Sequence, residues 1–237
     1  MYAVDLHTHT RFFHGHRALG DRFDPLGVRM LAEMADRRGL EGFATTNHDY
    51  FTPFAPTASV TTLPGIEITT SRGHVLVIGP DPPAETEPGA LTPGEVVDLA
   101  HERDCAAIVA HPFRNSTVRE LEDVPFDAIE VNGKHPRSRP LVKELAENRD
   151  LPLVGGSDAH YPFEVGRAYT VVDADRLTPG ALVEAIRDGR VDARVSHSRF
   201  DRLVRRGYRA IHRQKRVIDA IERPTPGVGT PPGEDSS

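Results

Sequence analysis

Residues 3–10 read Ala-Val-Asp-Leu-His-Thr-His-Thr, and they contain the first expected strand together with two histidines that close it. The apolar residues within 3–6 predict a short buried strand. Because side chains alternate along an extended chain, His7 and His9 should point to the same side, where they can bind one metal ion together. This stretch therefore predicts a metal site at the end of a strand.

The same arrangement recurs along the chain, where short apolar runs rich in Val and Ile alternate with helix-like segments. This alternation predicts an α/β fold with a parallel sheet, and we expect one barrel-like domain. The expected strands are residues 3–6, 42–46, 65–69, 75–78, 107–110, 128–131, 153–155 and 168–172. If the strands are parallel, their carboxyl ends meet at one rim, where barrel enzymes carry out their chemistry. Further metal-binding side chains follow or lie within these runs: His48, Glu67, His111, Asp158 and His160.

Three helices are also expected. Residues 25–38 carry apolar side chains at helical spacing and are followed by Gly39, a suitable C-cap. Thr92 and Thr178 each precede a proline, which predicts helices that begin at Pro93 and Pro179.

The composition is typical of a globular protein, with 38% hydrophobic and 27% charged residues. No apolar stretch approaches the roughly 20 residues that a membrane span needs. The N-terminus lacks the basic start and long apolar centre of a secretory signal, so we expect a cytoplasmic protein. The single cysteine, Cys105, lies beside an apolar run and is expected to be a small core residue.

Charge is distributed unevenly along the chain. Residues 199–223 carry a net charge of +6, whereas the first 198 residues carry −10 and the last 14 carry −2. An acidic body argues against a broad nucleic-acid-binding surface, which needs clustered positive charge. We expect a barrel domain at residues 1–196, a basic helical segment at 197–223 and a disordered tail at 224–237. The basic segment is interpreted as a helix packed on the acidic barrel; a basic amphipathic helix for RNA, an anionic membrane or a partner is the alternative.

The histidine content is the most unusual feature, with 12 histidines in 237 residues. Imidazole and carboxylate ligands suit Zn, Mn or Fe, and the ligands at the expected rim exceed what a single ion can use. We therefore expect two to three divalent metal ions.

In their order, these motifs resemble those of the polymerase and histidinol phosphatase (PHP) family of metal-dependent phosphoesterases. The resemblance covers residues 1 to about 195 and implies a distorted TIM-like (β/α)7 barrel of about seven parallel strands, with a site that commonly holds three metal ions. Asn47 stands where the family usually has Asp. The matching pieces are Asp5-Leu6-His7-Thr8-His9-Thr10, Thr46-Asn47-His48-Asp49, Gly65-Ile66-Glu67-Ile68, Ala110-His111-Pro112, Glu130-Val131-Asn132-Gly133 and Gly156-Ser157-Asp158-Ala159-His160.

The resemblance also implies how the first two ions are shared. His7 and His9 should bind one ion together with Glu67 and Asp158. Glu67 should bridge to a second ion that His111 holds.

His74 is either a further ligand of that second ion or a substrate contact. His48 and His160 should hold a third ion with a ligand from the loop after His9. His14 is our first choice for this ligand, and His16 is the alternative.

The resulting hypothesis is hydrolysis of phosphate esters by water that clustered metal ions activate, without a protein nucleophile. Arg114 and Arg167 are candidate catalytic residues that bind the phosphate, because a guanidinium group binds phosphate oxygens bidentately; ordinary surface arginines are the alternative. Asp158 or His160 could also assist proton transfer to the leaving group.

Several substrates fit this chemistry. A small phosphomonoester or nucleotide comes first, because the compact barrel has no appended polymerase or nucleic-acid module. A 5′ to 3′ exonuclease on short oligonucleotides comes second, and a histidinol phosphatase third. From a different class, the chain could be a non-catalytic metal-binding regulatory module, although clustering so many polar groups without a use is costly. The oligomeric state is not predicted.

Overall fold

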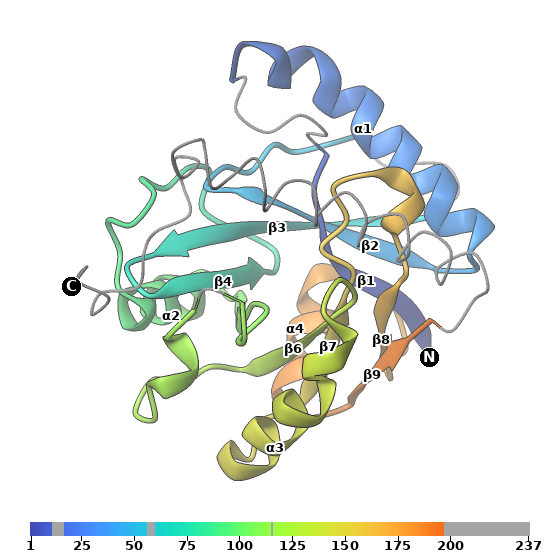
Figure 1. Ribbon diagram of the computed structural model, residues 1–237. Helices are drawn as coiled ribbons and strands as arrows, with labels where there is room; N and C mark the ends of the chain where they lie inside the picture. Colours follow the sequence, from blue (N-terminus) through green and yellow to red (C-terminus); the bar gives the residue numbers. More distant parts are fainter. Residues whose placement is uncertain (11–16, 56–59, 115, 197–237) are drawn as a thin grey trace, which may run out of the picture.

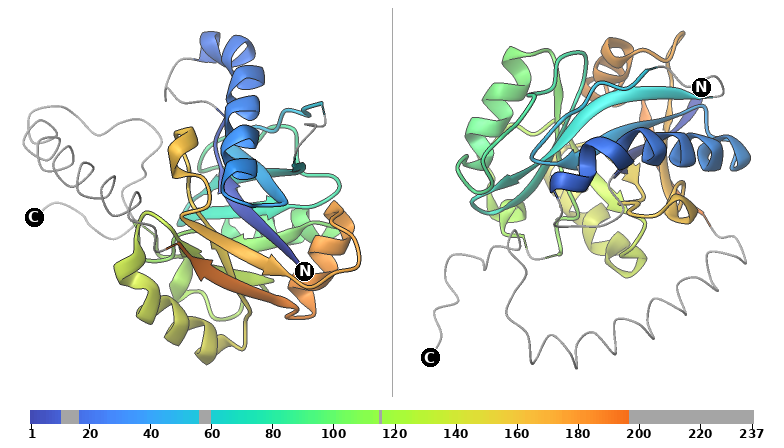
Figure 2. Two further views of the ribbon diagram at one scale, coloured as in Figure 1. Left: turned by 90° about the vertical axis from the view of Figure 1, so that its right-hand side faces the viewer. Right: turned by 90° about the horizontal axis from the view of Figure 1, so that it is seen from above.

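In the computed structural model, residues 1–10, 17–55, 60–114 and 116–196 are described. Their strands form a single mixed sheet that curves into a nearly closed barrel, with the helices on its outside (Figures 1 and 2). The strands are β1 (Tyr2–Thr8), β2 (Gly42–His48), β3 (Thr61–Thr70), β4 (Gly73–Ile78), β5 (Ala106–Val109), β6 (Ala128–Asn132), β7 (Leu153–Gly156), β8 (Ala168–Val172) and β9 (Val191–Val195). The α-helices are α1 (Arg17–Arg37), α2 (Pro93–Glu102), α3 (Arg139–Arg149) and α4 (Pro179–Arg187).

The sheet has the strand order β7-β6-β5-β4-β3-β2-β1-β8-β9. The expectation of a wholly parallel sheet was wrong, because β4 is antiparallel to both its neighbours, and β8 pairs antiparallel with β1 and β9. The reason lies partly in the connections. Only a two-residue turn, Ser71-Arg72, joins β3 to β4, and a parallel pair would need a long crossover. The α/β barrel class itself is confirmed.

The barrel closes where the edge strand β7 approaches β9, the other edge strand, together with β8 and β1. The Thr170 hydroxyl of β8 donates to the Gly155 carbonyl at 3.1 Å and accepts from the Gly155 N–H at 2.8 Å. A Cβ on Gly155 would collide with the backbone of Tyr169, so only glycine allows this close approach. Next to it, Thr8 of β1 forms a bridge with Ala159. These contacts bring the loop after β7 beside the end of β1.

The helix starts expected from capping patterns are confirmed for α2 and α4. The Thr92 side chain accepts a hydrogen bond from the Glu95 N–H, and Thr178 does the same for Ala181, with a proline in the first turn of each helix.

Helix α1 begins earlier than predicted and continues through Pro25, the residue at which the sequence pattern predicts its start. A proline inside a helix removes a hydrogen bond at a cost of about 3 kcal/mol. The buried carboxylate of Asp24, the preceding residue, accepts hydrogen bonds from the hydroxyls of Thr10 and Tyr50. This anchorage holds the turn against the barrel despite the proline.

Two elements were not predicted. Strand β9 alternates exposed charged residues with a single buried side chain, Ala193, and α3 buries only Val142 and Ala146 of its eleven residues. Both have weak apolar patterns because they lie at the outside or edge of the barrel.

Cys105, which directly precedes β5, is fully buried, as predicted for a core residue. Among the described residues, none of the helices is long and apolar enough to cross a membrane. The expected basic segment at 197–223 and the tail at 224–237 lie outside the described residues.

Candidate metal centre

The side chains predicted as metal ligands converge at one end of the barrel. His7 and His9 come from the end of β1, His48 from the end of β2, and Glu67 from β3 opposite His48. His74 is the second residue of β4, and it reaches the same rim because that strand runs in the opposite direction. The loops after β5 and β7 add His111, Asp158 and His160.

Eight of the nine predicted ligands therefore lie together; His14, like its alternative His16, falls outside the described residues. Ligand atoms within each of four groups lie no more than 4.8 Å apart. The groups are His7, His9 and Asp158; His7, Glu67 and His111; His48, Glu67 and His74; and His9, His48 and His160.

Glu67 lies at the middle of this cluster and is fully buried. Its two carboxylate oxygens lie between 2.7 and 3.3 Å from ring nitrogens of five histidines. Burial alone would favour the neutral acid, but the surrounding histidines hold the pKa of Glu67 well below its ordinary value. Glu67 is thus a carboxylate with both oxygens available to neighbouring positive charges, as a bridging ligand requires. The five histidines are His7, His9, His48, His74 and His111.

Asp158 is the second buried carboxylate of the cluster. Its Oδ1 atom lies 3.1 Å from a ring nitrogen of His160 and 3.5 Å from His9 Nε2. Although burial opposes ionisation, Lys134 and His160 keep the pKa of Asp158 well below its ordinary value.

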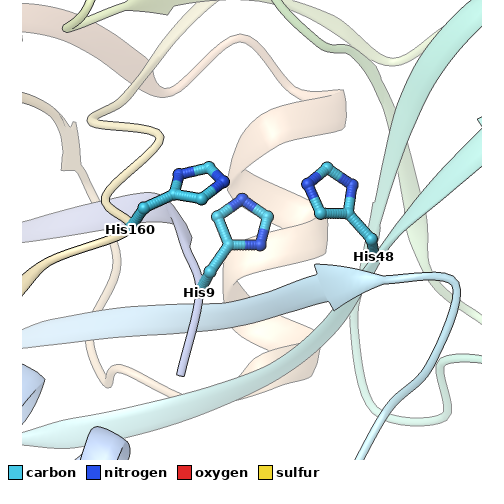
Figure 3. A group of neighbouring side chains, drawn as sticks. All are labelled: His9, His48 and His160. Atoms are coloured by element: carbon cyan, nitrogen blue, oxygen red, sulfur yellow. The ribbon is translucent and has the colours of Figure 1, made fainter. Parts of the chain in front are cut away.

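The rings of His9, His48 and His160 face one another, as Figure 3 shows. The ring centroid of His9 lies 4.6 Å from that of His48 and 4.2 Å from that of His160. Burial, with the nearby His160 and His48, holds the pKa of His9 well below its ordinary value, so the ring stays neutral. A neutral imidazole is the form that binds a metal ion.

These residues fit a group of divalent ions. Neutral imidazoles and ionised carboxylates are the donors that Zn, Mn and Fe accept. The buried Nε2 atom of His9 makes no hydrogen bond to any described residue, although oxygens of Glu67 and Asp158 lie 3.3 and 3.5 Å away. A buried imidazole nitrogen without a partner is unfavourable in a protein alone, and a bound cation would satisfy it.

Glu130 contacts two of the candidate ligands, His7 and His111, a role that we did not assign from the sequence. Its Oε1 lies 2.8 Å from His7 Nδ1, and its Oε2 accepts a hydrogen bond from the His111 backbone N–H at 2.7 Å. A carboxylate on the far ring nitrogen orients a metal-binding histidine. Burial works against protonation of His7, but Glu130 and Glu67 together raise its pKa well above the ordinary value.

Backbone strain accompanies the ligands. Three of the five described non-glycine residues with positive φ lie at the centre, namely Asp49 after His48, His111 and Asp158. A left-handed conformation at such residues costs free energy and is concentrated at functional sites. The Asp49 carboxylate accepts hydrogen bonds from the Thr69 N–H and hydroxyl, both at 2.7 Å, and this holds the turn after β2.

Two cationic side chains reach the rim beside Asp158. Arg114 Nη1 lies 2.9 Å from Asp158 Oδ2, and Lys134 Nζ lies 3.2 Å from Asp158 Oδ1 and 2.6 Å from His160 Nδ1. Lys134 was not among the side chains that we predicted at the site, although it comes shortly after β6, just as His111 comes shortly after β5. A small surface pocket beside this rim is lined by His111, Arg114 and His135.

Arg167, the other arginine predicted to bind phosphate, lies elsewhere. Its side chain is 2% exposed and its Nη1 lies 3.1 Å from Glu164 Oε1. A buried guanidinium paired with a carboxylate is poorly placed to meet a substrate, and this position favours a role through Glu164.

The comparisons with known proteins agree with this geometry. A family model for PHP-associated sequences (PHP_C) matches residues 136–191, the segment that carries Asp158 and His160. An uncharacterized protein of Methanocaldococcus jannaschii, MJ0417, is 32% identical over 120 residues, which are 45% of this chain and 49% of that protein. The chain therefore spans about half the length of this curated relative.

Several solved structures share the fold at 20% identity or less. PsfC from Pseudomonas syringae has a TM-score of 0.69 at 20% identity, over 90% of this chain and 98% of that chain. A two-domain protein from Bacteroides vulgatus with a predicted PHP-like metal-dependent phosphoesterase has a TM-score of 0.57 at 20% identity, over 82% of this chain and 64% of that chain. The lesion-specific endonuclease PfuEndoQ from Pyrococcus furiosus has a TM-score of 0.55 at 18% identity, over 81% of this chain and 57% of that chain. The matched PHP-associated segment and the shared fold make this chain similar to PHP-type proteins.

Proposed function

We propose that this chain is a metal-dependent hydrolase of phosphate esters, with a small phosphomonoester or nucleotide as its substrate and water as the nucleophile. The observation that carries the proposal is the buried Glu67, whose oxygens meet five imidazoles at 2.7 to 3.3 Å beside a second ionised carboxylate, Asp158. Two to three divalent ions held there would lower the pKa of a water molecule and neutralise charge on phosphate oxygens.

The residues around the centre supply the remaining functions. Glu67, Asp158 and the clustered histidines provide the donors, and Glu130 orients His7 through the hydrogen-bond distance of 2.8 Å. Arg114 and Lys134 present positive charge at the rim, where they can bind phosphate oxygens and fix the ester in place. Asp158 or His160 is our candidate to move a proton to the leaving group.

Support for this reaction class comes from the fold neighbours. They include predicted metal-dependent phosphoesterases and endonuclease Q, one structure of which is a complex with a 27-mer DNA duplex. A 5′ to 3′ exonuclease on short oligonucleotides is therefore the second candidate, and a histidinol phosphatase is the third. We infer Mn, Zn or Fe as the metal from the mixed histidine and carboxylate donors.

The test combines metal analysis with turnover. Metal content is measured by mass spectrometry on the purified chain, and hydrolysis of 4-nitrophenyl phosphate and bis(4-nitrophenyl) phosphate is assayed with added manganese. We expect two to three ions per chain and faster cleavage of the monoester. The His7→Ala variant should lose activity and bind less metal, because His7 belongs to two of the four ligand groups.

His101→Ala is the matched control. His101 lies in α2 and pairs with Asp127 at 3.0 Å, outside the ligand groups, so this variant should keep its metal and its activity. A fully active and fully metallated His7→Ala protein would contradict the assignment. Metal binding without turnover of either ester would instead favour the regulatory-module alternative, and preferred cleavage of the diester would favour the exonuclease.

A further inference from the structure

Two buried carboxylates outside the ligand set hold the loop at residues 157–167, which carries Asp158 and His160. Asp5 of β1 accepts hydrogen bonds from both ends of the loop, at 2.9 Å from the Ser157 N–H and 2.7 Å from the Gly166 N–H. In the middle of the loop, Glu164 accepts from two successive backbone N–H groups, which are those of His160 at 2.8 Å and Tyr161 at 3.0 Å.

Glu164 is paired with Arg167. Its Oε1 lies 3.1 Å from Arg167 Nη1, while Oε2 serves the backbone of His160, and both side chains are at most 2% exposed. A buried ion pair adds little stability compared with apolar side chains of similar volume, because two charges must leave water. The contact with Arg167 nevertheless fixes the position of the Glu164 side chain, whose other oxygen accepts hydrogen bonds from the His160 and Tyr161 N–H groups.

We infer that Glu164, held by Arg167, positions His160 and thereby the ion position that His160 shares with His9 and His48. Glu164 is a positioning residue: it acts on the backbone N–H of His160, and the ring then lies 3.1 Å from Asp158 Oδ1 and 4.2 Å, between centroids, from His9. This inference rests on the proposed metal centre. It explains why Arg167 is buried behind the loop.

Two other roles for the pair make different predictions. If Glu164 only caps the short helix at Pro162–Glu164, its loss should lower thermal stability without a selective change in metal binding. If Arg167 binds substrate phosphate, its loss should raise KM for a phosphate ester and leave metal content unchanged.

The experiment uses the full chain, and manganese and zinc as probes. The central variant is the double substitution Glu164→Gln with Arg167→Met, which leaves no unpaired buried charge and so is the one most able to fold. Ions per chain are counted by native mass spectrometry, and individual affinities are measured by competition with a chelator. Far-UV circular dichroism and thermal melting of the metal-free protein check the fold. Arg167→Lys, which keeps the positive charge, is the conservative variant.

The matched control is Arg187→Met. Arg187 pairs with the carboxylate of Asp127 at 3.2 Å and donates to the Cys105 carbonyl just before β5, at the end of that strand opposite His111. This variant also loses an arginine ion pair, but it should bind metal like the wild type.

We expect the double variant to bind one ion fewer per chain, or to hold its weakest ion about 10- to 100-fold less tightly, with the other ions unchanged. Arg167→Lys should recover most of this loss. A folded double variant with the ion number and affinities of the wild type would overturn the inference. Loss of all ions together would also overturn it. So would a raised KM for a phosphate ester with unchanged metal content. A wild-type chain that binds no metal would overturn the proposed function itself, which separates the two failures. If the double variant does not fold, Glu164→Asp, which keeps a carboxylate for Arg167 but shortens its reach to the His160 N–H, is judged by the same ion count.

Discussion

At the scale of single residues, Asp158 contacts both a candidate metal ligand, His160, and two cationic side chains, Arg114 and Lys134. Its Oδ1 atom lies 3.1 Å from His160 Nδ1 and 3.2 Å from Lys134 Nζ, and its Oδ2 atom lies 2.9 Å from Arg114 Nη1. In the proposed reaction, Asp158 would therefore lie between the metal ions and the substrate. The side chain of Lys134 is 19% exposed and that of Arg114 is 46% exposed, so both are accessible from solvent and are our candidates to contact the ester.

We predict that Lys134→Met raises KM for a phosphomonoester by about 10-fold or more, because a charge-assisted hydrogen bond to phosphate contributes about 1.5–3 kcal/mol. Methionine preserves the apolar stem, so folding and ion number should stay at wild-type values. Steady-state kinetics and metal analysis on the same preparation test this, with Lys134→Arg expected to keep most of the affinity. An unchanged KM would rule out a substrate contact for Lys134.

At the scale of elements, strand β7 is held so close to β1 and β6 that its glycines are essential. A Cβ on Gly156 would collide with Glu130 Oε1 and with the Cβ of His7, two residues whose side chains are hydrogen-bonded to each other. The strand can pass between them only without a side chain.

Gly156→Ala should therefore destabilise the fold by about 1–3 kcal/mol, as overpacking does, and should weaken metal binding by moving His7. Chemical denaturation and ion counting measure the two effects. Gly180→Ala provides the comparison, since a Cβ there meets nothing within 4 Å at the start of α4, and it should be neutral or slightly stabilising. Equal stability of the two variants would show that β7 can move away from His7.

At the scale of the whole molecule, the candidate ligands are spread between residues 7 and 160 of the sequence. They join β1, β2, the β3–β4 hairpin and the loops after β5 and β7, so bound ions would cross-link the barrel at one end. Because the unfolded chain does not hold these side chains together, metal should bind the folded state preferentially.

Metal removal by a chelator should lower Tm by roughly 5–10 °C, since a ligand at 100 times its Kd adds about 2.7 kcal/mol and a domain of this size shifts by about 2–4 °C per kcal/mol. Differential scanning calorimetry with manganese and with chelator measures the difference. His7→Ala should show a much smaller shift. A wild-type Tm that is identical under both conditions, with bound metal verified, would mean that the ions do not stabilise the barrel.

The sequence alone predicts much of the fold, and most of its candidate ligands lie together in the structure, because the relevant signals are local. The alternation in a strand places His7 and His9 on one side, and the threonine and proline pairs mark the starts of α2 and α4. Eight of the nine predicted ligands then lie together without any contact being known in advance. Strand β9 and helix α3 escape prediction because their few buried residues produce no clear apolar period.

Only the tertiary structure decides which distant residues support those ligands. Glu130 meets His7 across 123 positions of sequence, and Asp5 meets Gly166 across 161. Such pairs have no local signature, since their proximity depends on how the barrel closes. The burial of Arg167 behind Glu164 and the position of Lys134 beside Asp158 follow from the same closure. The kinds of side chain at the strand ends thus indicate the chemistry that we propose, whereas the three-dimensional packing determines which candidate ligands lie together, which cationic side chains lie at the rim and which residues hold the others in place.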